Sequence, residues 1–323
     1  MSFKDILGQD RAINLLQKQL SNNKVPHAYL FSGAEGTGRK KTALELAKAL
    51  NCRNQDGCAC DTCVSCKKTE GGNHPDVHLV DFNFQAALLD EDAEKQTRIK
   101  IETIKEAQKQ ISMKASEGRW KVFIIDPAEK MNAESANCLL KTLEEPPANS
   151  LMILVSSSNS SMPQTLLSRC QQIRFNRLPD GIISKIIWKA APEKTGSLND
   201  VIKFAGGSVS RALQYAENPG DIRELLELWE GLKNNRAGTL DLLSFSDTLA
   251  RDKQQLEEFI SKILVLAQSE LSETPDLPEK AELIEFILKC KKSMRYNVNS
   301  GLLSDILLMK LSSLGEGINA SSR

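Results

Sequence analysis

The segment at residues 33–42, GAEGTGRKKT, is built like a phosphate-binding loop but lacks the side chains that complete one. In the full pattern, GxxxxGK[ST], backbone N–H groups hold the phosphates, the lysine reaches the β- and γ-phosphates, and the hydroxyl holds Mg²⁺. The glycines that form the turn are present, at Gly33, Gly36 and Gly38. Arg39 stands in place of the lysine, and Lys40 stands in place of the hydroxyl residue. We therefore expect a nucleotide site that keeps its shape and has lost its chemistry.

The surroundings of this loop favour a P-loop origin over an unrelated glycine-rich turn. An apolar run at 28–31 precedes the loop as a buried strand would, and apolar residues at helical spacing follow it. Further along, the residues KVFIID predict a central parallel strand that ends in Asp126, where the acid of a P-loop ATPase would hold Mg²⁺. The next residue is Pro127 instead of the glutamate that activates water, and Glu129 lies two positions beyond it.

Five of the eight cysteines lie between positions 52 and 66. The four whose spacing suits a tetrahedral structural zinc ion are Cys52, Cys60, Cys63 and Cys66. Cys58 is the fifth, and the spacing leaves open that it replaces Cys52 or Cys60. A redox cluster or an iron–sulfur site would use a similar set of thiolates, but zinc is the favoured reading. We expect His74 and His78 to be hydrogen-bonded structural residues instead of ligands.

Composition limits the other classes of function. The chain has 323 residues, of which 41% are hydrophobic, so it is expected to form globular domains with a sizeable core. Its 42 basic and 42 acidic residues balance, which argues against broad, charge-driven DNA binding. The polar N-terminus does not resemble a signal peptide, and no run is long enough to span a membrane. We expect a cytoplasmic protein whose cysteines are thiols or metal ligands.

Several segments of the sequence together resemble a known protein family. The chain resembles the delta prime chains of the bacterial DNA polymerase III clamp loader, AAA+ proteins that are related to the gamma/tau ATPase subunits. The matching segments are FKDILGQ at 3–9, HAYLFSG at 27–33, HPDVHLV at 74–80, ANCLLKTLEEPP at 136–147 and the SRC-containing stretch at 151–175. The two prolines that close the fourth segment are consistent with the end of a helix.

The resemblance implies a role for the arginine of the SRC motif. In related clamp loaders this arginine projects into the ATP site of the neighbouring subunit, where it acts as an arginine finger. The matching residue here is Arg169. From spacing alone, an ion pair with a nearby carboxylate would be the simpler role for this residue, and the resemblance reverses that preference. In the segment that resembles sensor 2, Ser210 stands where an ATPase has a phosphate-contacting arginine, and Arg211 follows it.

The resemblance therefore implies a clamp-loader subunit that does not hydrolyse ATP and supplies Arg169 in trans. Its expected partners are the gamma/tau ATPase subunits and the delta subunit, with the sliding clamp and primed DNA reached through the assembled complex. Binding of ATP or ADP to the altered loop stays open, because backbone N–H groups and Arg39 can still hold phosphate. Two alternatives remain: an ATP-hydrolysing gamma/tau-like motor, and a zinc-dependent nucleic-acid-binding module.

The expected architecture has three parts. Residues 1–176 are predicted to form an α/β P-loop domain of the AAA+ type, with the zinc module embedded at about 52–66. Within this domain, the stretch 81–98 lacks a clean period and is expected to be a surface insertion. A small helical lid at 177–216 and an all-α collar domain at 217–323 are expected to follow.

Overall fold

The computed structural model describes residues 3–54, 58–159, 162–190, 198–234, 239–273, 278–294, 296 and 298–320. The chain divides into two compact units. The first contains residues 1–189 and 206–211, and the second contains residues 190–205 and 212–323. This division crosses the stretch expected to be a separate lid, so the three-part division stays a prediction.

The first unit is built on a five-stranded parallel sheet with the order β2-β3-β4-β1-β5. The strands are β1 (Ala28–Gly33), β2 (Val77–Val80), β3 (Lys121–Ile125), β4 (Ser150–Ser156) and β5 (Gln171–Phe175). Every residue of β3 and β4 is buried, as expected for strands covered on both faces. Because all five strands run in the same direction, the loops that follow them meet at one edge of the sheet.

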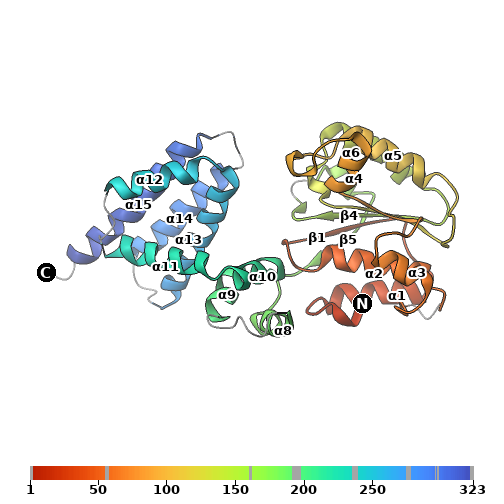
Figure 1. Cartoon of the computed structure of the whole chain (residues 1–323), viewed down its shortest axis with the longest axis horizontal. Coiled ribbons are helices and arrows are strands. Elements are labelled where there is room, and N and C mark those ends of the chain that lie inside the picture. The colour runs from red at the N-terminus through yellow and green to blue at the C-terminus, as the bar shows by residue number, and fades with distance from the viewer. Residues whose placement is uncertain are drawn as a thin grey trace. The chain divides into compact units, whose positions relative to one another are not determined.

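Helices cover both faces of this sheet (Figure 1). On one face lie α1 (Asp10–Ser21), α2 (Arg39–Asn51) and α3 (Val64–Glu70), and on the other lie α4 (Phe82–Leu89), α5 (Ile101–Ile111) and α6 (Ala133–Glu144). A hydrophobic core lies on each face of the sheet, and successive side chains of β1 point to opposite faces. Tyr29 and Phe31 belong to the core under α1 and α2, and Leu30 belongs to the core under α5 and α6. Shorter elements are η1 (Phe3–Asp5), η2 (Ala93–Lys95), η3 (Ala128–Lys130) and α7 (Gln164–Leu167).

The stretch 81–98 is more ordered than a simple surface insertion. It contains α4 and η2, and it is fixed by Gln85, which is completely buried. The Gln85 amide donates to the Arg98 carbonyl at 3.0 Å, and its oxygen accepts the Lys100 N–H at 2.6 Å and the Thr103 hydroxyl at 2.8 Å. Sequence periodicity missed this helix because its fully buried side chain is polar.

A buried aspartate closes the connection that leads into β3. Asp76 is completely buried and accepts three backbone N–H groups, from Ser116 at 2.7 Å, Glu117 at 2.8 Å and Gly118 at 2.7 Å. Burial alone would raise the pKa of Asp76, but the three N–H donors together outweigh burial and lower it. The ionised carboxylate is therefore part of the folded structure.

Replacing this carboxylate should cost stability in a pH-dependent way. We expect Asp76→Asn to lower the free energy of unfolding by about 3 kcal/mol at neutral pH, because an amide cannot accept all three N–H groups. A lowered pKa in the folded state means that the stabilisation is complete above the unfolded pKa of about 3.9 and is lost as the pH falls through the folded value. Urea unfolding at several pH values would check this. A difference from wild type that stays constant to below about pH 3 would contradict it, and Asp92→Asn, at an exposed aspartate that accepts one N–H, is the control.

After β5 the described residues are helical and contain no further strand. The helices are α8 (Asp180–Ala190), α9 (Leu198–Ala205), α10 (Val209–Glu217), α11 (Gly220–Lys233), α12 (Thr239–Ala250), α13 (Lys253–Glu273), α14 (Pro278–Ser293) and α15 (Ser300–Ala320). The core of the second unit includes Trp229, Ile260, Ile287 and Leu307. The expectation of an all-helical C-terminal region is confirmed for the described residues. None of the helices described here is long and apolar enough to cross a membrane.

Candidate functional site

The altered nucleotide loop connects β1 to α2 and has the shape that its glycines predict. Gly38 is the N-cap residue of α2 and has a left-handed backbone, with φ of 92°. The Thr37 hydroxyl donates to the Ala34 carbonyl at 2.7 Å, which closes the turn. From outside the loop, the buried Gln9 amide donates to the carbonyls of Thr37 at 3.2 Å and Asn176 at 2.7 Å. The loop is thus held by the N-terminal segment and by the residue that follows β5.

The stretch that resembles sensor 2 contacts this loop directly. The Val209 N–H donates to the Gly36 carbonyl at 3.0 Å. Gly36 has φ of 71°, and a Cβ there would overlap the side chains of Ser208 and Ser210, so glycine is required on both counts. Ser210, at the position of the expected arginine, places its hydroxyl 3.2 Å from that of Ser208.

Acidic and basic side chains meet at the edge of the sheet where the strands end. Asp81 directly follows β2, and Asp126 directly follows β3. Lys40 Nζ lies 3.6 Å from Asp81 Oδ2 and 3.9 Å from Asp126 Oδ2. Asp126 is partly withdrawn from solvent, and burial raises its pKa despite the opposing effect of Lys40 and Arg39.

Arg39 is the other cation of this edge, and it is 8% exposed. Burial lowers its pKa, while Asp126, Glu129 and Glu35 act in the opposite direction. Its buried Nη1 atom has no hydrogen-bond partner among the described residues. Glu129 is also engaged: its Oε1 accepts the N–H of Ser157 at 3.1 Å and the hydroxyl of the same residue.

These groups do not fit the Mg²⁺ site of an active P-loop ATPase. That site needs a hydroxyl at the position of Lys40, and here an ammonium group faces Asp126. Glu129 bonds to the backbone and hydroxyl of Ser157, so its Oε1 is committed to contacts within the chain.

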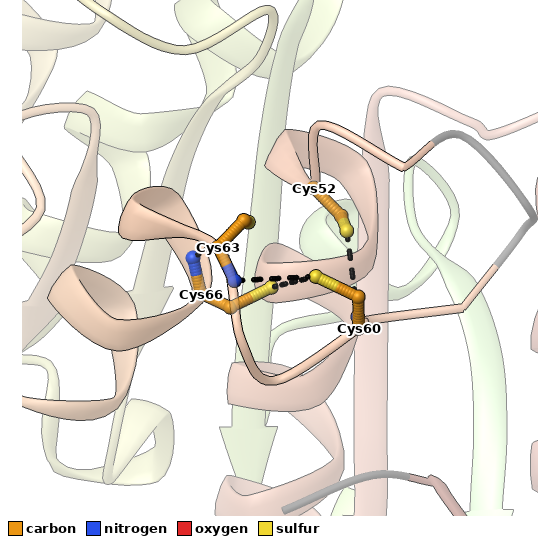
Figure 2. A group of neighbouring side chains, drawn as sticks. All are labelled: Cys52, Cys60, Cys63 and Cys66. Carbon is orange, nitrogen blue, oxygen red and sulfur yellow. Dashed lines mark hydrogen bonds between the residues drawn. The ribbon is translucent and has the colours of Figure 1, made fainter.

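The four cysteines predicted to bind zinc lie together beside α2. The sulfur atoms of Cys52, Cys60, Cys63 and Cys66 all lie within 4.8 Å of one another, and those of Cys60 and Cys66 are 4.0 Å apart (Figure 2). A tetrahedral zinc ion with bonds of about 2.3 Å would set its sulfur ligands roughly 3.8 Å apart, so the cluster can hold such an ion. Cys58 is exposed and lies outside the cluster, and residues 55–57 are outside the described residues.

Backbone N–H groups are directed at these sulfur atoms. The N–H of Cys60 donates to Cys52 Sγ at 3.4 Å, that of Cys63 to Cys60 Sγ at 3.4 Å, and that of Cys66 to Cys63 Sγ at 3.5 Å. The Thr62 hydroxyl and N–H, with the Cys63 N–H, lower the pKa of Cys60 to about 6. Burial raises the pKa of Cys66 to about 12. A bound cation would stabilise the thiolate form of the buried cysteine, which its apolar surroundings disfavour.

A buried lysine joins the cysteine cluster to α2. Lys48 is 1% exposed, and its Nζ lies 2.5 Å from Asp61 Oδ1 and 3.2 Å from Glu45 Oε1. The carboxylate of Glu70, at the end of α3, lies 3.8 Å away. Asp61 is between two of the cluster cysteines, so the ion pair links their loop to the helix that begins at the nucleotide loop.

Arg169 lies after α7 and forms an ion pair within its own chain. Its Nη2 and Nε donate to Glu144 Oε1, at 2.6 Å and 3.0 Å, and its Nη1 donates to the Thr165 carbonyl at 3.0 Å. The two side chains are 35% and 51% exposed, so this pair is at the surface and contributes little to stability. The chain therefore presents a positioned guanidinium group at its surface.

Sequence reasoning did not find several partners of these residues. Asp81, Ser157 and Glu144 were not assigned the contacts they make, because each contact joins positions from 25 to 41 residues apart. Asp81 had a detectable signal, since it follows an apolar strand in the same way as Asp126.

The two histidines behave differently from each other. His74 bonds to Ser65 and to the Asp76 N–H, whereas His78 stacks on Phe123 and leaves its Nε2 without a partner among the described residues.

The family described as "DNA polymerase III, delta subunit" matches residues 8–179, which is more than half of the chain. The chain belongs to this family. Residues 8–179, which match the family, contain the nucleotide loop, the cysteine cluster, the charged sheet edge and Arg169.

Individual relatives agree with this family. The chain is 29% identical to the DNA polymerase III subunit delta′ of Bacillus subtilis, over 93% of this chain and 95% of that protein. It is 33% identical to the DNA polymerase III subunit tau/gamma of Haemophilus influenzae, over 67% of this chain and 30% of the relative. Among solved structures, a DNA polymerase III gamma subunit-related protein from Thermotoga maritima shares the fold, with a TM-score of 0.51 at 15% identity over 94% of this chain and 99% of that one.

Proposed function

We propose that this chain is a delta prime-type subunit of the bacterial DNA polymerase III clamp loader that does not itself hydrolyse ATP. In the assembled complex it supports ATP-driven loading of the sliding clamp onto primed DNA. It supplies Arg169 to the ATP site of a neighbouring gamma/tau subunit. Its other partner is the delta subunit.

The observation that carries this proposal is the contrast between the chain's own nucleotide loop and its arginine. At the loop, Lys40 replaces the Mg²⁺-binding hydroxyl and lies 3.9 Å from Asp126. Glu129, the nearest acid to the expected catalytic position, is bound to Ser157. Arg169, in contrast, is partly exposed and fixed in orientation by Glu144. In the complex we propose that this surface guanidinium exchanges Glu144 for phosphate oxygens of the neighbouring site, where it stabilises the charge that develops on them.

Zinc has a structural role in this proposal. A site with four thiolate ligands leaves no position free for substrate, which is typical of structural zinc. The metal would hold residues 58–63 against α2, where Lys48 already contacts Asp61.

The remaining parts of the chain have proposed roles in assembly. We assign residues 177–216 to a small helical lid and residues 217–323 to the collar through which subunits associate. Three apolar side chains on α15 support the second assignment: Leu302 is 58% exposed, Ile306 is 44% exposed and Met309 is 60% exposed. Their spacing of three or four residues places them on one face of the helix.

The isolated chain should show no ATP turnover above background. The planar guanidinium of Arg39 does not replace a compact ammonium group, and Lys40 removes the hydroxyl that would bind Mg²⁺. A steady-state assay of phosphate release by the purified chain would test this, with Asp126→Ala as a control for contaminating ATPases. Robust Mg²⁺-dependent turnover that Asp126→Ala abolishes would contradict the proposal and favour an ATP-hydrolysing motor.

A further inference from the structure

The side chain of Lys40 lies between two acids that come from separate elements. Asp81 follows β2 and Asp126 follows β3, and these strands are neighbours in the sheet. The Lys40 Nζ is 3.6 Å from the first carboxylate and 3.9 Å from the second. One ammonium group therefore lies within reach of both acids, at the position where the loop pattern has its metal-binding hydroxyl.

A positive charge in the first turn of a helix is unfavourable unless negative charge lies nearby. The first turn of a helix favours negative charge, because its free N–H groups carry partial positive charge. The first turn of α2 contains no acid, and it begins with three consecutive cations, Arg39, Lys40 and Lys41. The carboxylates of Asp81 and Asp126 provide the negative charge that the helix itself lacks.

The orientation of Asp81 is fixed by a second contact. Asp81 is the N-cap residue of α4, and its Oδ1 accepts the Phe84 N–H at 3.0 Å. Its other oxygen, Oδ2, faces Lys40. The side chains of Asp81 and Asp126 are 16% and 20% exposed, whereas that of Lys40 is 45% exposed. The acids are thus mostly enclosed, and the ammonium group closes their solvent side.

We propose that Lys40 is a built-in cation that takes the place of Mg²⁺ and excludes divalent ions from this edge of the sheet. A divalent ion that entered would have to displace the ammonium group and would then lie among Arg39 and Lys40. This inference rests on the proposed function, because it treats residues 33–42 as an altered nucleotide loop. It adds a specific cause for the absence of Mg²⁺ binding. The ammonium group of Lys40 occupies the position of the metal ion, in addition to removing the hydroxyl that would bind it.

The test uses the full chain with Mn²⁺ alone as the probe, and measures free Mn²⁺ by electron paramagnetic resonance. Lys40→Thr removes the ammonium group and restores the hydroxyl. We expect this variant to bind Mn²⁺ at least roughly tenfold more tightly than wild type, because two acids then face the ion without a competing cation. Adding Asp126→Asn to the variant should abolish the gain. Mg²⁺ at matched ionic strength should raise the thermal unfolding midpoint of Lys40→Thr and leave that of wild type unchanged.

Lys41→Thr is the matched control, because Lys41 is the next residue of the same turn and its Nζ donates to the Asp5 carbonyl at 3.1 Å. It should bind Mn²⁺ as wild type does. If Lys40→Thr does not fold, Lys40→Gln keeps a polar stem without charge and should show the same gain. Equal Mn²⁺ affinities of wild type and the folded Lys40 variant, whether both bind or neither does, would overturn the inference. Turnover of ATP by the isolated wild type would instead contradict the proposed function, so the two failures are distinguishable.

Discussion

Arg169→Ala should sharply slow ATP hydrolysis at one site of the assembled clamp loader while leaving the variant chain folded and incorporated. Loss of an arginine finger typically slows phosphoryl transfer at the affected site by about 10³-fold or more. The other sites of the complex keep their own fingers, so total turnover should fall only in part. Clamp loading should fall further, because it requires all sites to act together.

The measurement is DNA-stimulated ATPase activity and clamp loading by complexes reconstituted with wild-type or variant chain. Gel filtration should first show that the Arg169→Ala chain assembles, since a complex that fails to form would confuse lost contact with lost catalysis. Arg98→Ala, at an exposed arginine between α4 and α5, is the control for general loss of positive charge. If the assembled Arg169→Ala complex matches wild type in both assays, the pair with Glu144 is the whole role of this residue.

The second large effect concerns the cysteine cluster. We expect one zinc ion per chain, and we expect Cys66→Ser to lose it and to disorder residues 58–63. Cys66 is completely buried and burial raises its pKa to about 12, so its thiolate form depends on a bound cation. Elemental analysis and thermal unfolding would measure the metal content and its contribution to stability.

Cys58→Ser is the matched control, because Cys58 is exposed and outside the cluster. It should keep a full equivalent of zinc and an unchanged unfolding midpoint. Iron in place of zinc, or a metal-free chain purified without chelators, would rule out the structural zinc site. Loss of zinc from Cys58→Ser would show that the ligand set differs from the four clustered cysteines.

Much of the first unit could be predicted because its signals are local. An apolar run followed by an acid predicted β3 and the position of Asp126, since parallel strands of a covered sheet are continuously apolar. The close spacing of Cys60, Cys63 and Cys66 likewise limits how far apart their sulfur atoms can be. The helix that ends at Glu144, just before two prolines, follows from the geometry of proline.

The contacts that define the charged edge could not be predicted in this way. Pairing of Lys40 with Asp81 depends on the order of strands in the sheet, and no periodic pattern reports that order. The bond between Gln9 and Asn176 joins positions 167 residues apart. Polar side chains such as Gln85 have no hydrophobic period, so their burial becomes visible only when the partners that satisfy them are assembled.

The buried ion pair of Lys48 limits how this chain could be re-engineered to work without metal. Shortening the segment between Cys60 and Cys63 would remove Asp61 and leave the ammonium group of Lys48 enclosed with less compensating charge. Removing one partner of a buried ion pair typically costs about 3–5 kcal/mol, whereas replacing the whole set with well-packed apolar residues is often neutral. A metal-free design would therefore change Lys48 and Glu45 on α2 together with the segment that carries Asp61.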